Sequence, residues 1–566
     1  MKKNAFTLIE LLAVIVILAI IALIATPIVV NIINDVKKSS HEESIKMYAK
    51  VLEKAATSYY MKYTSEKSVT LEDLEREKLI NYSGDKVECD IVKIYSNGKV
   101  YLKDCKVKGE RVDYTYGEKQ RDPNITVDLE EGLIPVIYDE DNWIVVDKND
   151  LQWYDYDEQK WANAVVLSQE AKTNNKNKVG SILTVDGENP DILMMFVYIP
   201  RYEYKIEGQY GIHADGIEGT QQLPGEIEVN FIKNDKMTPT NGYILHPAFT
   251  FDDQQINGFW MGKFELSHIE LSSSSTSNNL GCTNANNGVT CAADSSKFRI
   301  LPNVVSLRRN NVSKFWYGIK SIENASSFGL MNIDIHMIKN SEWGAIAYLS
   351  QSIYGKYGNS DYDRTQKEIY QNKSSNHITG NSNGTPSQDI SYTQCAYNQK
   401  TGTNTNQDQK NCGPGASTTG NIYGVYDMNG GSWEYVMGVF SDIDGIYSGN
   451  SSNPNSALGY SGFNGKLSSS NEIINYGLDI PTMKYYDKYT TNIMTTTCDS
   501  KICYGHALSE TSGWYNDYSE MITRDWPWFI RSGYYGFNEQ SGIFAFSQST
   551  GKESSEITTR VVGIVK

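Results

Sequence analysis

The first part of the chain combines a purely apolar segment with an amphipathic one. Residues 11–25 form an unbroken apolar run, which is preceded by a short basic leader and by the acidic residue Glu10. As an α-helix, residues 8–33 would measure about 39 Å, which is enough to cross the hydrocarbon core of a membrane with some tilt. Downstream, apolar side chains return at helical spacing while Lys and Glu fill the other face: Ile45, Tyr48, Leu52, Ala55 and Tyr59. The pattern predicts a long helix whose second half needs a cover for its apolar stripe.

A β-hairpin is predicted to supply that cover. Two strand-like segments, 86–95 and 99–107, flank Ser96-Asn97-Gly98, and a short helix that opens at Thr70 precedes them. If the turn has three residues with Gly98 in the left-handed conformation, Cys89 faces Cys105 across the hairpin. The sequence therefore predicts a compact first module that a disulfide closes.

A change in composition after Tyr116 marks a domain boundary. The segment 118–124 is charged and polar, as in a solvated connection. Short β-type runs with aromatic anchors follow at residues 133–138, 143–147, 153–156 and 161–165. We expect a first module that ends at residue 117, a β-rich lead-in at 118–190 and a large domain at 191–566.

The charge of the chain excludes one class of partner. Lys and Arg total 52 against 68 Asp and Glu, which gives a net charge of −16, and no long basic stripe interrupts this acidity. Nucleic acid is therefore not an expected partner, because its binding rests on clustered cations. The abundance of Tyr, at 39 residues, and long tracts of Ser, Asn, Thr and Gly suit extracellular loops and adaptable binding surfaces.

The cysteines suggest disulfides outside the cytoplasm. None lies in a CxxC pair, which argues against a zinc site. The eight residues fall into local couples, although the sequence does not prove the connectivity: Cys89 with Cys105, Cys282 with Cys291, Cys395 with Cys412, and Cys498 with Cys503.

The N-terminus resembles the class III prepilin leader of type IV pilins and type II secretion pseudopilins. The resemblance lies in a short basic leader, a small residue and then Phe6-Thr7-Leu8-Ile9-Glu10. It implies that a membrane prepilin peptidase cuts between Ala5 and Phe6 and methylates Phe6, although the family usually has Gly where this chain has Ala5. It also implies assembly with other pilin or pseudopilin subunits, in which the Glu10 carboxylate pairs with the terminal amine of a neighbour.

Two other interpretations of this segment are a secretory signal peptide cut near Ala25 and a plain signal anchor. Glu10 argues against the signal peptide, because a charge at the head of an apolar helix is costly to bury. Pro27 is expected to kink or locally melt the helix, and related pilins carry a proline at the corresponding place. With this resemblance, 1–5 is a leader peptide, 6–117 a pilin module, and the protein a single-pass bacterial membrane protein that reaches a pilus or the cell surface on assembly.

The region from 191 onward resembles the formylglycine-generating enzymes, which share a C-type-lectin-like fold. The resembling stretches are residues 195–203, 259–265, 340–349, 420–435 and 528–562. The expected fold class is therefore α+β: a long N-terminal transmembrane pilin helix with a small β headgroup, followed by a large, loop-rich lectin-like domain.

Enzymatic activity is not expected. In the formylglycine-generating enzymes two cysteines in the last strands bind copper and attack the substrate, whereas residues 531–560 contain no cysteine. The seven histidines show no metal-binding spacing, and the sequence has neither a nucleophile elbow nor a Walker loop. No cofactor is predicted, but calcium held by loop carboxylates and amides stays open.

Recognition is the function that these patterns favour. Aromatic and amide side chains gather near the C-terminus, in a composition typical of surfaces that bind glycans or proteins. We take as candidate ligand-binding residues Trp526, Tyr534, Tyr535, Asn538 and Gln540, whereas Trp528 and Phe529 are expected in the core. The chain is thus expected to be a minor type IV pilin-like surface protein with a lectin-like adhesion domain. The alternative is a type II secretion pseudopilin that engages exported cargo, and an oxidase of the formylglycine-generating type is the third hypothesis.

Overall fold

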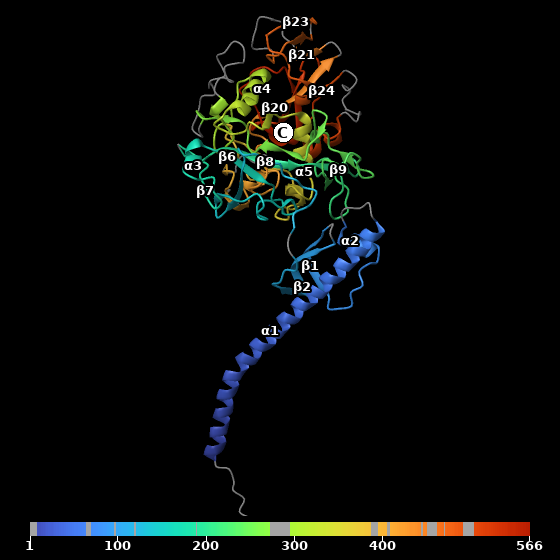
Figure 1. Ribbon diagram of the computed structural model, residues 1–566, viewed down its shortest axis with the longest axis vertical. Coiled ribbons are helices and arrows are strands. Elements are labelled where there is room, and N and C mark those ends of the chain that lie inside the picture. The colour runs from blue at the N-terminus through green and yellow to red at the C-terminus, as the bar shows by residue number, and fades with distance from the viewer. Residues whose placement is uncertain are drawn as a thin grey trace, which may run out of the picture. The chain divides into compact units, whose positions relative to one another are not determined.

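The computed structural model divides the chain into two compact units, Met1–Asp122 and Pro123–Lys566 (Figure 1). It describes residues 8–63, 69–95, 98–117, 120–187, 189–271, 295–386, 394–403, 408–442, 445–449, 461–468, 470–490 and 503–566. The fold is mixed, with many strands and few helices.

The first unit is built on one long helix, α1 (Leu8–Lys62), drawn in blue in Figure 1. Its C-terminal part carries the predicted apolar stripe, and its buried residues are Ile45, Ala49, Leu52, Ala55, Ala56 and Tyr59. Glu10 and Pro27 lie within the helical span, but their side chains are outside the described part of the chain. Among the residues that the structure describes, no helix combines the length and the apolar character needed to cross a membrane.

A three-stranded antiparallel sheet covers the stripe of α1. Its strands follow the order β1 (Val87–Ile94), β2 (Val100–Val107) and β3 (Glu110–Val112). Cys89 pairs with Cys105 in the register of β1 and β2, as the hairpin pattern predicts, and the two form a disulfide. The short helix α2 (Leu71–Arg76) begins after Thr70, whose side chain accepts a hydrogen bond from the Asp73 amide in a capping box.

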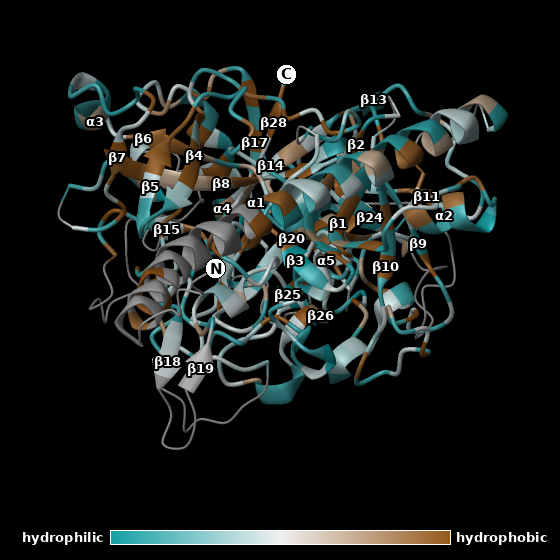
Figure 2. Ribbon diagram, turned by 90° about the horizontal axis from the view of Figure 1, so that it is seen from below, coloured by the Kyte–Doolittle hydropathy of each residue, from teal (hydrophilic) through white to brown (hydrophobic). Residues whose placement is uncertain are grey.

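The second unit contains an eight-stranded sheet that joins strands from distant parts of the sequence. In spatial order these are β17 (Ile333–Met337), β28 (Val561–Val565), β14 (Gly258–Gly262), β8 (Ile192–Pro200), β6 (Asn163–Leu167), β4 (Ile134–Asp139), β5 (Asn142–Val145) and β7 (Ile182–Leu183). The segment 118–190, expected as a lead-in, supplies four of these strands. In Figure 2, β6 and β28 are mostly brown, because both are largely apolar and buried.

A second sheet of eight strands carries the C-terminal region. Its main path runs through β23 (Ile473–Ile474), β22 (Gly465–Leu467), β21 (Gly445–Gly449), β20 (Trp433–Asp442), β25 (Trp528–Ser532) and β26 (Gly542–Ser549). The strands β24 (Asp487–Tyr489) and β27 (Ile557–Thr559) each pair in parallel with β20.

The remaining elements are short and connect the two large sheets. The helices are α3 (Gln169–Thr173), α4 (Val312–Ser321) and α5 (Asn340–Ser350). The small sheets are formed by β9 (Tyr202–Ile206) with β10 (Ile227–Phe231) and β11 (Ile244–Leu245), by β12 (Thr250–Phe251) with β13 (Gln254–Gln255), by β15 (Ser267–His268) with β16 (Phe298–Arg299), and by β18 (Thr401–Thr403) with β19 (Asp408–Lys410).

Charged side chains are buried between the two large sheets. The Arg560 guanidinium donates two hydrogen bonds from Nε and one from Nη2 to the Glu434 carboxylate, at 2.7–3.1 Å, and neither side chain is exposed. Burial raises the pKa of the nearby Glu265 and Asp427 carboxyls. This cluster joins β20 to the residue before β28 and so links the two sheets by an ion pair.

Candidate functional site

The residues predicted to bind a ligand lie at opposite ends of β25. Trp526 precedes this strand and is 44% exposed, whereas Tyr534, Tyr535, Asn538 and Gln540 follow it. Because β25 alone spans about 13 Å, the structure gathers the last four residues into one connection and leaves Trp526 apart from them.

The connection between β25 and β26, residues 533–541, is a compact turn. Gly533 has a φ of +81°, and a Cβ there would come within 2.4 Å of the Ser541 hydroxyl oxygen. The Ser541 hydroxyl donates to the Tyr534 carbonyl at 3.0 Å, and the Ser541 amide donates to the Asn538 carbonyl at 3.0 Å. The turn therefore needs glycine at 533 and presents residues 538–540, which form η14 (Asn538–Gln540), to solvent.

Aromatic packing fixes the inner side of this turn. The ring of Phe537 meets Trp433 and Tyr518 edge to face, with centroids 5.2 Å apart in both cases. Tyr534 and Tyr535 are half-buried and contact each other edge to face at 5.4 Å. Trp528 and Phe529 have no exposed surface. The outer face of the turn is therefore made of tyrosine edges and of exposed amides.

A segment far upstream completes the same surface. The Lys373 ammonium donates to Oδ1 of Asn538 at 3.2 Å, and Nε2 of Gln371 donates to the Asn538 carbonyl at 3.1 Å. The His377 ring contacts the Tyr535 ring edge to face at 5.1 Å. The sequence analysis did not identify these three residues, because no local pattern links them to a turn more than 150 positions away.

His377 is a structural partner of this turn and a poor proton acceptor. Its Nδ1 lies 2.9 Å from the Ser432 hydroxyl, which has no exposed surface. Burial and the nearby Arg308 lower the pKa of His377 to about 3. The imidazole is therefore neutral at physiological pH, and the arrangement orients Tyr535 instead of activating a nucleophile.

Two carboxyl groups lie beneath the turn. Burial and the charge of Asp517 raise the pKa of Glu368, and burial raises the pKa of Asp517. Within the described ranges, no group of three or more His, Cys, Asp or Glu side chains is arranged to hold a metal ion.

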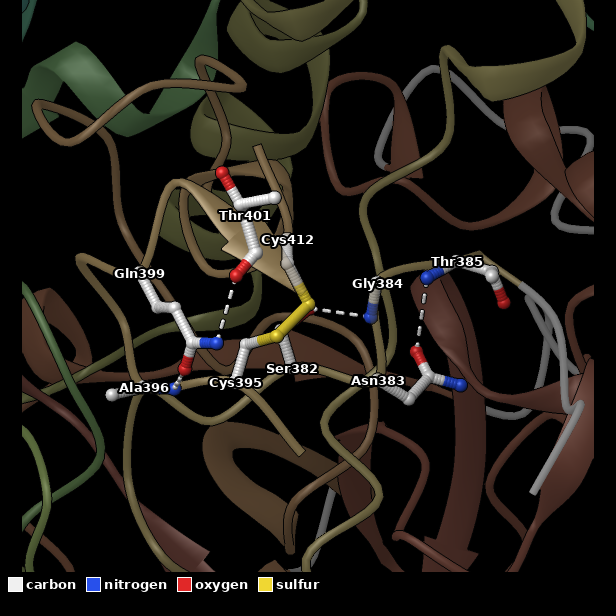
Figure 3. The surroundings of a disulfide bond; sticks show 9 residues. All are labelled: Ser382, Asn383, Gly384, Thr385, Cys395, Ala396, Gln399, Thr401 and Cys412. Carbon is white, nitrogen blue, oxygen red and sulfur yellow. Dashed lines mark hydrogen bonds between the residues drawn. A yellow bond between two sulfur atoms is a disulfide. The ribbon is translucent and has the colours of Figure 1, made fainter. Parts of the chain in front are cut away.

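A disulfide holds the loop that contains β18 and β19 (Figure 3). Cys395 and Cys412 are bonded and fully buried, and the backbone of Cys395 exchanges two hydrogen bonds with that of Ser382. Cys503 is disulfide-bonded as well. Cys498, its expected partner, and the couple Cys282 and Cys291 lie outside the described residues.

Removing the Cys395–Cys412 bond is expected to destabilise the second unit by about 3 kcal/mol, because the bond closes a loop with a sequence separation of 17. The double substitution Cys395→Ser and Cys412→Ser should show this loss in urea denaturation followed by tryptophan fluorescence. The Cys89→Ser and Cys105→Ser double variant is the control, because that bond lies in the other unit. An unchanged denaturation midpoint in the first variant would contradict the prediction.

The comparisons with known proteins concern the N-terminus. Residues 1–26 match a prokaryotic N-terminal methylation motif. No curated protein matches the chain. Ala5 and Phe6, which flank the expected cleavage site, lie outside the described residues, and Glu10 lies in α1. The N-terminus of this chain is therefore that of a type IV pilin-like protein, and its motif implies processing by a prepilin peptidase and assembly with other pilin subunits.

Proposed function

We propose that the chain is a minor type IV pilin-like surface protein of bacteria that displays a ligand-binding domain. The observation that carries this proposal is the methylation motif at residues 1–26 joined to a second unit, Pro123–Lys566, that is much larger than the helical module. We further propose that the apolar segment at residues 11–25 anchors the protein in the membrane before assembly. A bulky second unit favours sparse incorporation or a place at a filament tip, because it would hinder dense packing along a shaft.

The second unit is proposed to have a lectin-like fold of the formylglycine-generating-enzyme type without that enzyme's chemistry. The turn at residues 533–541 supports a binding role, since it presents tyrosines and amides on a rigid scaffold. The stretch 531–560 has no cysteine to supply a copper ligand or a nucleophile. The ligand is proposed to be a glycan or a protein at the cell surface.

Assembly is expected to depend on the charge of Glu10. In the Glu10→Val variant, the mature N-terminus should still be N-methylated Phe6, but the protein should remain in the membrane, because the terminal amine of the neighbouring subunit has lost its partner. N-terminal sequencing and immunoblots of sheared filaments measure the two effects. Glu10→Asp is the matched control and should keep part of the assembly. Normal amounts of Glu10→Val in filaments would argue against the proposed pairing.

Ligand binding is expected to depend on the turn at 533–541. On glycan and host-surface protein arrays, Tyr535→Ala and Asn538→Ala should each weaken a specific signal at least about tenfold, the loss expected when a central aromatic or polar contact is removed. Trp526→Ala, at the other end of β25, is the control and should bind as the wild type does.

The same arrays test the proposal against its rivals. Equal loss in all three variants would indicate unfolding, and no signal with a folded wild type would favour a secretion pseudopilin. Labelling of the second unit on intact cells separates the two, because a pilus subunit exposes it and a pseudopilin does not.

A further inference from the structure

Three buried side-chain oxygens beneath the turn η14 have no hydrogen-bond donor. They are Oε1 of Gln371, Oδ1 of Asn429 and Oδ1 of Asp517. These residues are only 0%, 1% and 3% exposed, respectively. Buried polar atoms are nearly always paired, so three unpaired acceptors in one region indicate a missing electropositive partner.

Asn429 and Gln371 lie side by side next to Glu368. Nδ2 of Asn429 donates to Oε1 of Glu368 at 3.2 Å and to the Ile369 carbonyl at 2.8 Å. The Asn372 amide donates to the Asn429 carbonyl at 2.8 Å, and a Cβ on Gly430 would lie 2.8 Å from Cγ of Gln371. The two amide side chains therefore share the neighbourhood of the Glu368 carboxylate.

Asp517 approaches the same place from the other side of η14. Its Oδ2 accepts from the Phe544 amide at 2.9 Å, while its Oδ1 is the unpaired atom. The next residue, Tyr518, donates its amide to the Gln540 carbonyl at 3.0 Å, just as Gln371 donates to the Asn538 carbonyl at 3.1 Å. Asp517 and Gln371 are therefore held under the same turn.

No cation of the protein neutralises these carboxylates. The described residues show no ion pair to Glu368 or Asp517. The Lys356 ammonium donates to the backbone carbonyls of Glu368 and Gly415, at 2.6 and 2.8 Å. The Arg531 guanidinium donates to Asn340 and to the carbonyls of residues 506 and 507. Two buried negative charges therefore keep unused lone pairs, an arrangement that favours an external cation.

We propose that a calcium ion binds here, held by the carboxylates of Glu368 and Asp517 and by the amide oxygens of Gln371 and Asn429. Four oxygen donors, with water in the remaining positions, match the ligands of this hard cation, and the absence of His and Cys among them disfavours zinc and copper. Glu368 is partly exposed and gives the ion a route from solvent. Because only two of the donors are acids, the site depends on its amides.

The proposed ion also positions the turn above it. Coordination through Oε1 of Gln371 aims Nε2 of the same amide at the Asn538 carbonyl. Gln371 is then a positioning residue for Asn538 and Gln540. The cation site itself does not rest on the proposed ligand-binding function.

Calcium titration of the full-length protein in detergent, after treatment with EDTA, tests the proposal. Isothermal calorimetry should give one calcium per chain, bound more tightly than magnesium. Glu368→Gln and Asp517→Asn should each weaken binding at least about tenfold, because each removes one of the two charged ligands. Glu510→Gln is the matched control: this carboxylate is partly buried, but its oxygens already accept from Tyr204, Tyr348 and the Gly505 amide.

The outcomes separate the site from its alternatives. No saturable calcium binding by the folded wild type overturns the proposal, as does binding that survives both substitutions, which would be adventitious. If the variants fail to fold, hydrogen exchange of the wild type decides: calcium should slow exchange at residues 538–541, and exchange unchanged by calcium would overturn the proposal.

Discussion

Arg560→Met is expected to lower the free energy of unfolding of the C-terminal unit by about 4 kcal/mol at pH 8. The substitution leaves the Glu434 carboxylate without a counter-ion in a site that has no exposed surface. It also removes the positive charge that faces Glu265 and Asp427. Urea denaturation of residues 123–566, followed by tryptophan fluorescence, measures the change.

The same measurement at lower pH checks the cause. Burial raises the pKa of Glu434, Glu265 and Asp427, so these groups favour the folded state when protonated, and that contribution is lost as pH rises through their folded pKa values. The loss caused by Arg560→Met should therefore be smaller at pH 5 than at pH 8.

Two further variants isolate the buried pair. Glu434→Leu combined with Arg560→Met should recover part of the stability, because no unpaired charge remains. Lys400→Met, which removes the exposed pair with Asp141, should change the free energy of unfolding by less than about 1 kcal/mol. Equal losses for Lys400→Met and Arg560→Met would show that burial is not the cause.

His336→Gln is expected to cost about 4 kcal/mol at pH 6, the second large effect in this unit. The imidazole is fully buried, with Nε2 3.0 Å from Glu342 and Nδ1 3.4 Å from Asp334. Burial alone would lower the pKa of His336, but Glu342 and Asp334 outweigh it and raise the pKa. The protonated ring therefore neutralises two carboxylates that hold β17 to α5.

The pH dependence of this contribution has a definite sign. Because the folded pKa of His336 is raised, the stabilisation is complete below about pH 6.5 and is lost as pH rises through the folded pKa. The difference in stability between wild type and His336→Gln should therefore shrink from pH 6 to pH 9. His506→Gln is the control, because burial lowers the pKa of His506 and reverses the sign. A difference that grows with pH would contradict this assignment.

Local features of the fold could be predicted from the sequence. The three-residue turn ending in Gly98 fixes the hairpin register, so Cys89 faces Cys105. Thr70 and Asp73 together mark the start of α2, and the stripe from Ile45 to Tyr59 marks the face of α1 that the sheet covers. Each of these depends on spacing within a few turns of chain, which sequence patterns record directly.

Long-range features could not be predicted in the same way. Arg560 and Glu434 are 126 positions apart, and Lys373 and Asn538 are 165 apart. Neither contact leaves a periodic trace, since one charged side chain in a buried strand looks like an interruption of the pattern. For the same reason Trp526 was grouped with Tyr534, although β25 separates them.

The position of β28 sets a schedule for synthesis and export. This strand lies between β14 and β17, yet it follows both in the chain, so the gap in the sheet stays open until the ribosome has passed residue 561. Until then the apolar edges of β14 and β17 have no partner between them, and the nascent chain is a substrate for translocation rather than a finished domain. Premature termination before β28 would therefore leave a secreted product open to proteases and to strand exchange with its neighbours.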